Sequence, residues 1–242
     1  METSQARGVL DLRSVGGGGG GGEDLALIAS LPKNSVTLAS QAEEGGADAI
    51  MVNIEGEEAS CPGHLGSYEL HDVYIKDVIS TLSIPCGIFV GGAKPLTAEY
   101  WESIVTGGFA FVDMYAHQMP LFVLNDLRVR KVVAVSAGYI LEQVRSLSEF
   151  GGVEAVEVAI VPQQARGNPF TVLDFATLKL IAGLSASAVL LRTQKKLTTR
   201  DLPRVASLGV KGLVIDPSIP AGAEEAYRDE VASFSPRRGS PD

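Results

Sequence analysis

The feature that most constrains the fold is a pattern that recurs along the chain. An amphipathic helical stretch ends near a glycine and is followed by a short apolar run rich in β-branched residues, around Gly45, Gly107, Gly151 and Gly209. A glycine just past a helix adopts a left-handed backbone conformation without a steric penalty, so the chain can turn directly into a strand. These joins predict repeated helix-to-strand units.

Apolar runs of strand length alternate with helical stretches along most of the chain, and no Asn-Gly hairpin signal joins neighbouring runs. We expect strands over residues 25–31, 49–55, 86–90, 109–115, 131–136, 155–161, 188–192 and 212–216. We expect helices over residues 35–44, 71–82, 97–106, 121–127, 140–150, 171–184, 199–208 and 223–233. Right-handed crossovers close eight such strands into a (β/α)8 barrel. An open doubly wound sheet is the alternative, but no GxGxxG motif follows any strand.

The two ends of the chain stand apart from this pattern. Residues 16–22 are consecutive glycines, which have no side chain to bury, so we expect residues 1–23 to form a flexible arm. Residues 24–234 would then make a single barrel domain. The polar stretch 235–242 would be a disordered tail.

Charge and composition exclude several classes of partner. With 29 acidic and 20 basic residues, the chain has a formal charge of −9 and no means of neutralising a run of phosphates, so nucleic acid is not expected. Cys61 and Cys86 form no metal or redox motif. No apolar run approaches the roughly 20 residues that span a bilayer, and the N-terminus lacks a secretion signal. We expect a cytoplasmic protein with no membrane partner.

Polar side chains follow the ends of the predicted strands, where barrels of this kind carry their chemistry. Side chains alternate along a strand, so the bulky apolar residues that face the helices assign their neighbours to the barrel interior. A one-residue slip would reverse any of these directions. The polar residues expected to point inward are Asn53, Glu55, Asp113, Tyr115, His117, Ser136, Glu157, Arg192, Gln194 and Asp216.

This ring combines four carboxylates with a single arginine. Burying unpaired charge is costly, so water, a ligand, a cation or altered protonation must compensate for it. We interpret Glu157 or Asp113 as a general base and His117 or Tyr115 as a general acid. A purely structural ion pair between Glu157 and Arg192 remains the alternative.

An anionic group could be held by Arg192 and Lys195, with Arg166 contributed by the loop after the sixth strand. The full set of side chains expected to bind substrate is Asn53, Glu55, Arg166, Arg192, Gln194, Lys195, Asp216 and Ser218.

Other chemistries stay open at this point. No cofactor is predicted and no HExxH-type motif occurs, but a divalent cation is an alternative. Its candidate ligands are Glu55, Asp113, His117, Glu157 and Asp216. Cys61 and His64 lie in a long loop suited to act as a lid, but no third group that would orient a nucleophile is identifiable. A barrel without catalysis, serving ligand binding or assembly, is a further alternative.

The order of elements, the helix–glycine–strand joins and the stretch QKKLTTRDLPRVASLGVKGLVID resemble the phosphate-binding TIM barrels. That group includes histidine-biosynthesis isomerases, thiamine phosphate synthase and sugar-phosphate epimerases. The resemblance covers about residues 25–234 and implies a TIM barrel that is an isomerase or lyase. Its substrate would be a small anionic metabolite, phosphorylated or carboxylated, altered by proton transfer.

Members of this group bind phosphate with small glycine-rich turns after the seventh and eighth strands. Here those turns read RTQKKL and DPSIPAG, so Lys195, Lys196, Ser218 and Gly222 would have to replace that pattern. Because such barrels often pair through their outer helices, a homo-oligomer is also expected.

Overall fold

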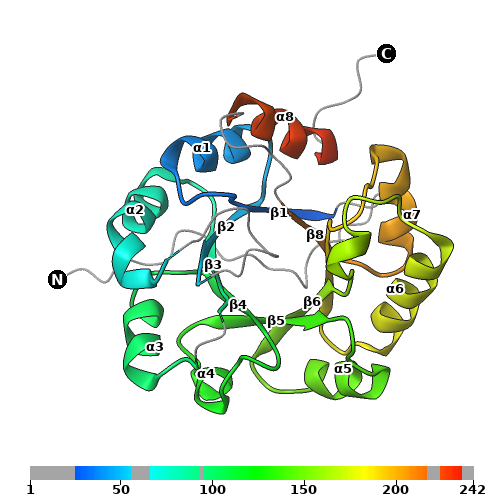
Figure 1. Cartoon of the computed structure of the whole chain (residues 1–242), viewed down its shortest axis with the longest axis horizontal. Helices are drawn as coiled ribbons and strands as arrows, with labels where there is room; N and C mark the ends of the chain where they lie inside the picture. Colours follow the sequence, from blue (N-terminus) through cyan, green and yellow to red (C-terminus); the bar gives the residue numbers. More distant parts are fainter. Residues whose placement is uncertain (1–24, 56–65, 93–94, 217–223, 236–242) are drawn as a thin grey trace.

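The computed structural model describes residues 25–55, 66–92, 95–216 and 224–235, and these form a closed barrel of parallel strands (Figure 1). The last strand pairs with the first, which closes the barrel. The predicted (β/α)8 TIM barrel is therefore confirmed. In chain order the strands are β1 (Ala26–Ser30), β2 (Ala49–Ile54), β3 (Cys86–Val90), β4 (Phe111–Tyr115), β5 (Arg130–Ser136), β6 (Val153–Ala159), β7 (Ala188–Arg192) and β8 (Gly212–Ile215).

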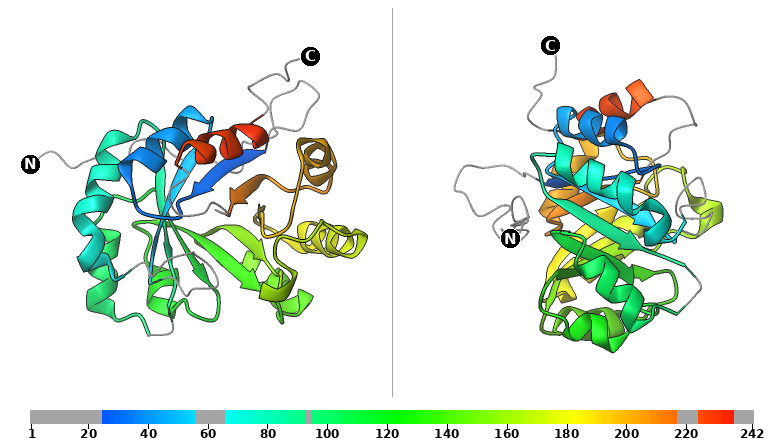
Figure 2. Two further views of the ribbon diagram at one scale, coloured as in Figure 1. Left: turned by 45° about the horizontal axis from the view of Figure 1, so that its top comes forward. Right: turned by 90° about the vertical axis from the view of Figure 1, so that its left-hand side faces the viewer.

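Helices surround the ring of strands (Figure 1), and the two further views show them outside the strands (Figure 2). They are α1 (Val36–Glu44), α2 (Tyr68–Thr81), α3 (Ala98–Val105), α4 (Leu121–Asn125), α5 (Leu141–Ser148), α6 (Val172–Leu184), α7 (Leu202–Ser207) and α8 (Glu224–Phe234), with short 3-10 turns at Gln163–Ala165 and Thr199–Asp201. Helix α2 begins three residues earlier than predicted. Its first residue, Tyr68, is buried and its N–H donates to the Tyr100 hydroxyl at 2.6 Å, a tertiary contact that local sequence does not reveal.

The helix–glycine–strand joins have the backbone conformation that the sequence pattern requires. The left-handed residues are Gly46, Gly108, Gly152 and Gly209, with φ between 86° and 95°. In the three glycine pairs the second glycine is the left-handed one, whereas Gly45 keeps a helical φ of −68°. The turn into the strand is thus made one residue later than the first glycine of each pair.

Apolar side chains fill both the inside of the barrel and the layer between strands and helices. The inner cluster consists of Ala26, Ile28, Ala49, Met51, Phe89, Phe111, Val132, Ala155, Leu190 and Val214. A Cβ at Gly87 would lie only 2.2 Å from the ring of Phe111, so glycine makes room for that ring. This inner core sets which side chains of each strand face the barrel axis.

Several expectations fall outside the described residues. They concern the arm over residues 1–23, the loop with Cys61 and His64, the turn with Ser218 and Gly222, and most of the tail. Within the described ranges, no helix has the length and apolar character needed to cross a bilayer.

Candidate functional site

Four strands deliver charged side chains to the C-terminal end of the barrel. Asp113 lies on β4, Glu157 on β6 and Arg192 on β7, and Asp216 directly follows β8. Each of them lies two residues beyond a member of the inner apolar cluster, so strand alternation turns it toward the axis. The side chains of the first three are at most 4% exposed, and that of Asp216 is 13% exposed.

The guanidinium of Arg192 lies at the centre of this charged cluster. Its Nε and Nη2 donate to the two carboxylate oxygens of Glu157 at 2.7 and 3.1 Å, and Nη1 donates to Asp216 Oδ1 at 3.3 Å. Asp113 Oδ2 lies 3.9 Å from Nη2. The guanidinium carbon is also 5.3 Å from the ring centroid of Phe89. Arg192 is therefore held on one side by carboxylates and on another by an aromatic ring.

Asp113 has the least favourable surroundings in the cluster. Neither of its carboxyl oxygens has a hydrogen-bond partner among the described residues. Burial and the nearby charge of Glu157 raise the pKa of Asp113 well above its ordinary value, although the Arg192 charge opposes the shift. The structure therefore favours the protonated form of this side chain.

Burial and neighbouring charges also shift the pKa values of Asp216 and Arg192. Burial raises the pKa of Asp216, while the charges of Arg192 and Arg166 act to lower it. Burial acts to lower the pKa of Arg192, but the charges of Glu157 and Asp216 outweigh it and the pKa of Arg192 is raised. Arg192 therefore stays charged.

A second arginine lies at the outer edge of the cluster. Arg166 follows the 3-10 turn after β6, and its Nη1 lies 3.9 Å from Asp216 Oδ2. Its side chain is 24% exposed, more than any of the four central groups. Nearby, Gln194 is buried and its Oε1 accepts from the N–H of Val161 at 3.0 Å, but its Nε2 has no hydrogen-bond partner among the described residues.

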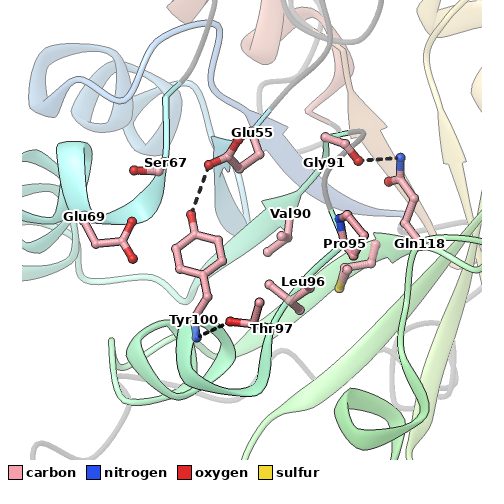
Figure 3. A pocket seen from close by; sticks show the side chains of 12 residues that line it. Glu55, Ser67, Glu69, Val90, Gly91, Pro95, Leu96, Thr97, Tyr100 and Gln118 are labelled. Carbon is pink, nitrogen blue, oxygen red and sulfur yellow. Dashed lines mark hydrogen bonds between the residues drawn. The ribbon is translucent and has the colours of Figure 1, made fainter.

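Glu55 was expected to point into the barrel, and that prediction is wrong. Its φ of 50° places it in the left-handed region at the end of β2, where strand alternation no longer applies. The Tyr100 hydroxyl donates to Glu55 Oε1 at 3.4 Å across a cavity of about 230 Å³ (Figure 3). That cavity is also lined by Val90 and Met114, which belong to the layer between strands and helices.

Lys195 and Asn53 are engaged in contacts within the protein. Lys195 Nζ lies 2.6 Å from Asp174 Oδ2 in the first turn of α6, so the expected role of Lys195 in holding an anion at the mouth is not supported.

Asn53 Nδ2 donates to Ser30 Oγ and to the carbonyl of Leu31. The backbone of Asn53 exchanges two hydrogen bonds with the Asn34 side chain. These bonds join the ends of β1 and β2.

Tyr115 and His117 form an aromatic group beside the cluster. Their rings stack with centroids 5.6 Å apart, and Tyr115 meets Phe89 edge-on at 5.7 Å. His117 is exposed, and its Nδ1 lies 2.8 Å from the Tyr139 hydroxyl. That hydroxyl also accepts from the His117 N–H at 2.9 Å. Sequence reasoning missed Tyr139, because no local signal links two residues 22 positions apart.

The arrangement does not fit a divalent cation. Across the described part of the chain, no group of three or more His, Cys, Asp or Glu side chains is placed to hold a metal ion. Arg192 already lies among the three carboxyl groups, and Glu55 and His117 lie apart from them. The positive charge that a metal would supply comes from the guanidinium.

Comparisons with known proteins bear on the fold alone. No protein-family model and no curated protein matches the chain. A chain in a structure of the tryptophan synthase α2β2 complex from Pyrococcus furiosus is similar in fold, with a TM-score of 0.64. The two sequences are 13% identical, and the match covers 88% of this chain and 98% of the other. A mutant α-subunit from the same organism gives 12% identity, the same coverage and a TM-score of 0.63. The YdjI aldolase from Escherichia coli K12 gives 13% identity over 86% and 87% of the two chains, with a TM-score of 0.52. These similarities confirm the (β/α)8 barrel fold.

Proposed function

We propose that this barrel is an enzyme, a lyase or an isomerase, that moves a proton within a small anionic metabolite bound at the C-terminal end of its strands. The observation that carries this proposal is the buried Asp113 carboxyl, unpartnered on both oxygens, beside Glu157 and Arg192. Leaving a buried polar group unpaired costs about 1–3 kcal/mol. A carboxyl whose pKa is shifted by burial and a charged neighbour, at the mouth of such a barrel, is a functional candidate with a physical reason.

Asp216 is proposed to remove a proton from a substrate carbon next to a carbonyl while Asp113 donates its proton to the carbonyl oxygen, which gives an enol. The reverse transfers then return a proton from Asp216 to carbon and a proton from the enol oxygen to Asp113, so both side chains regain their starting forms. Asp113 is proposed to stay protonated at neutral pH, because ionising all three carboxyls would leave one negative charge uncompensated by Arg192 and Arg166, and burial raises the pKa of Asp113. A neutral carboxylic acid can donate its proton to a reacting group. Asp216 lies nearest to solvent and acts as the base. Glu157, with both oxygens bound by Arg192, is a positioning residue instead of the base expected from the sequence.

The substrate's negative charge is proposed to bind at Arg166. Arg166 has the most exposed side chain of the three arginine and lysine residues expected to hold an anion, at 24%, against 10% for Lys195 and 4% for Arg192. A guanidinium suits a carboxylate or a phosphate, since it offers two parallel donors. Tyr115 and His117, expected from the sequence to supply the general acid, are proposed here to contact the substrate on the β4 side. Ser218 remains proposed for the turn after β8. The aldolase among the similar folds provides a precedent for lyase chemistry on this architecture.

Deuterium exchange tests this proposal without knowledge of the natural substrate. The protein is incubated in D2O with small hydroxy acids, keto acids and their phosphate esters, and loss of C–H signals is followed by proton NMR. We expect the wild type to exchange a proton next to a carbonyl in at least one compound. Asp113→Asn and Asp216→Asn should each slow that exchange by about 10²- to 10⁴-fold.

Asp201→Asn is the matched control, because it makes the same chemical change at an exposed capping site beside Thr198. Circular dichroism establishes that each variant is folded. Absence of exchange with every compound would contradict the proposal, as would equal rates in the wild type and both cluster variants. Tight binding of one of these anions without exchange would instead identify a non-catalytic ligand-binding barrel.

A further inference from the structure

The outer face of α6 is apolar except for Lys179. The helix lies at the periphery of the barrel between α5 and α7 (Figure 1), and its Leu178 and Ile181 are buried against the strands. Val172 is 88% exposed and Leu173 is 74% exposed. The exposed positions of α6 are Val172, Leu173, Ala176, Lys179, Leu180, Gly183 and Leu184.

These positions form one continuous stripe. With 3.6 residues per turn they fall within an arc of about 140°, and Lys179 lies at its edge. Along the stripe Leu173, Ala176, Leu180 and Gly183 alternate large and small at spacings of three and four residues. This spacing is typical of helix surfaces that pack against another helix. Contiguous exposed apolar surface of this kind is a candidate interaction site.

Charge distinguishes this stripe from the other exposed apolar helix face. On α2, Leu70, Val73 and Tyr74 are exposed, but Glu69 and Asp77 lie on the same helix among them. The α6 stripe contains no acidic side chain, in a chain whose formal charge is −9. A second copy of this chain therefore meets less like-charge repulsion at α6 than at α2.

We propose that α6 is the centre of a homodimer interface. The two copies of the helix pack antiparallel through their exposed stripes, and the two-fold axis crosses α6 midway between Ala176 and Leu180 along the helix. In this arrangement Leu173 lies opposite the partner's Gly183, and Leu180 lies opposite the partner's Ala176. Each leucine thus meets a small residue, and the symmetry repeats both contacts. Such a self-complementary contact is the usual form of a two-fold interface.

The size of the surface predicts the strength of the dimer. A helix of this length, 13 residues, spans about 20 Å. Two such helices alone cover less than the roughly 800 Å² per partner of a standard interface. Neighbouring parts of α5 and α7 must therefore add to the contact, and a dissociation constant in the micromolar range is expected.

Sedimentation velocity of the full chain over a series of concentrations tests the proposal, and dimers are expected at the higher concentrations. Leu180→Glu should raise the dimer dissociation constant by at least about 100-fold, because it removes a buried leucine from both copies. Leu70→Glu on α2 is the matched control, since that leucine is 74% exposed, and it should leave dimerisation unchanged.

The substitution Gly183→Leu distinguishes the proposed packing of the two α6 helices from non-specific hydrophobic association. No atom lies within 4 Å of a Cβ added at Gly183, so the monomer accommodates the change. The new side chain should weaken the dimer by filling the space needed by the partner's Leu173, whereas non-specific association would become stronger. A chain that stays monomeric at every concentration would overturn the proposal, as would a dimer insensitive to both α6 substitutions. Dimerisation that appears only after deletion of residues 1–24 would identify that segment as the occupant instead.

Discussion

The buried carboxyl of Asp113 is expected to lower the stability of the folded protein at neutral pH. Its carboxyl is buried, its oxygens are unpartnered and its pKa is raised well above the ordinary value by burial and by Glu157. Asp113→Asn keeps the shape of the side chain and removes the ionisable group. We therefore predict that this variant is at least as stable as the wild type at pH 7, as measured by chemical denaturation.

The difference in unfolding free energy between Asp113→Asn and the wild type should depend on pH, because the pKa of Asp113 is raised in the folded state. A raised folded-state pKa means that the Asp113 contribution to stability is fully present below the unfolded value of about 3.9 and is lost as the pH rises through the folded-state pKa. The free energy of unfolding of Asp113→Asn, relative to wild type, should accordingly increase as the pH rises above about 4 and then level off. A difference that shrinks over this range would contradict the raised pKa.

Glu157→Gln provides the contrast, because it breaks the two-point pairing with Arg192. Removing one partner of a buried ion pair typically costs about 3–5 kcal/mol of unfolding free energy. If Asp113→Asn proved as destabilising as Glu157→Gln, Asp113 would be a structural member of the ion-pair cluster and not a functional acid.

At the scale of the secondary-structure elements, the inner packing of β3 against β4 offers a direct test. A Cβ at Gly87 would lie 2.2 Å from the Phe111 ring, so Gly87→Ala forces the ring or the strand to move. Overpacking of this kind costs about 1–3 kcal/mol, measurable by thermal or urea denaturation. Gly151→Ala is the control, since no atom lies within 4 Å of its added Cβ and its φ is not left-handed. Equal stability of the two variants would show that the inner core is looser than described.

The alternation of side chains along a regular strand predicts which of them face the barrel interior, and this rule predicted the charged cluster around Arg192. It therefore predicts from sequence alone that Asp113, Glu157 and Arg192 point inward at the same end of the barrel. The same rule failed at Glu55, whose left-handed φ lies just past β2. Lys195 was expected to hold an anion because it follows β7, but its partner Asp174 belongs to the preceding helix. Past the end of a strand, side-chain direction depends on tertiary contacts that one sequence does not display.

For the whole molecule, closure of the barrel joins the two ends of the described chain. The Tyr227 hydroxyl on α8 donates to the carbonyl of Ser30 at the end of β1 at 2.7 Å, across 197 residues of sequence. Tyr227→Phe leaves that buried carbonyl without this donor and should lower the free energy of unfolding by about 1–3 kcal/mol. Because β1 also pairs with β8, we expect a single cooperative transition at a lower temperature. Separate melting of α8 before the barrel would contradict this coupling.

The proposed chemistry requires that the Asp113 carboxyl, in the charged cluster around Arg192, keeps its proton at neutral pH. Carbon-13 NMR of protein labelled at the aspartate side-chain carboxyl carbons, compared between wild type and Asp113→Asn at pH 7, measures this protonation directly. We predict one aspartate resonance with the chemical shift of a protonated carboxyl in the wild type, absent from the variant. A wild-type spectrum in which every aspartate carboxyl is ionised would contradict the account.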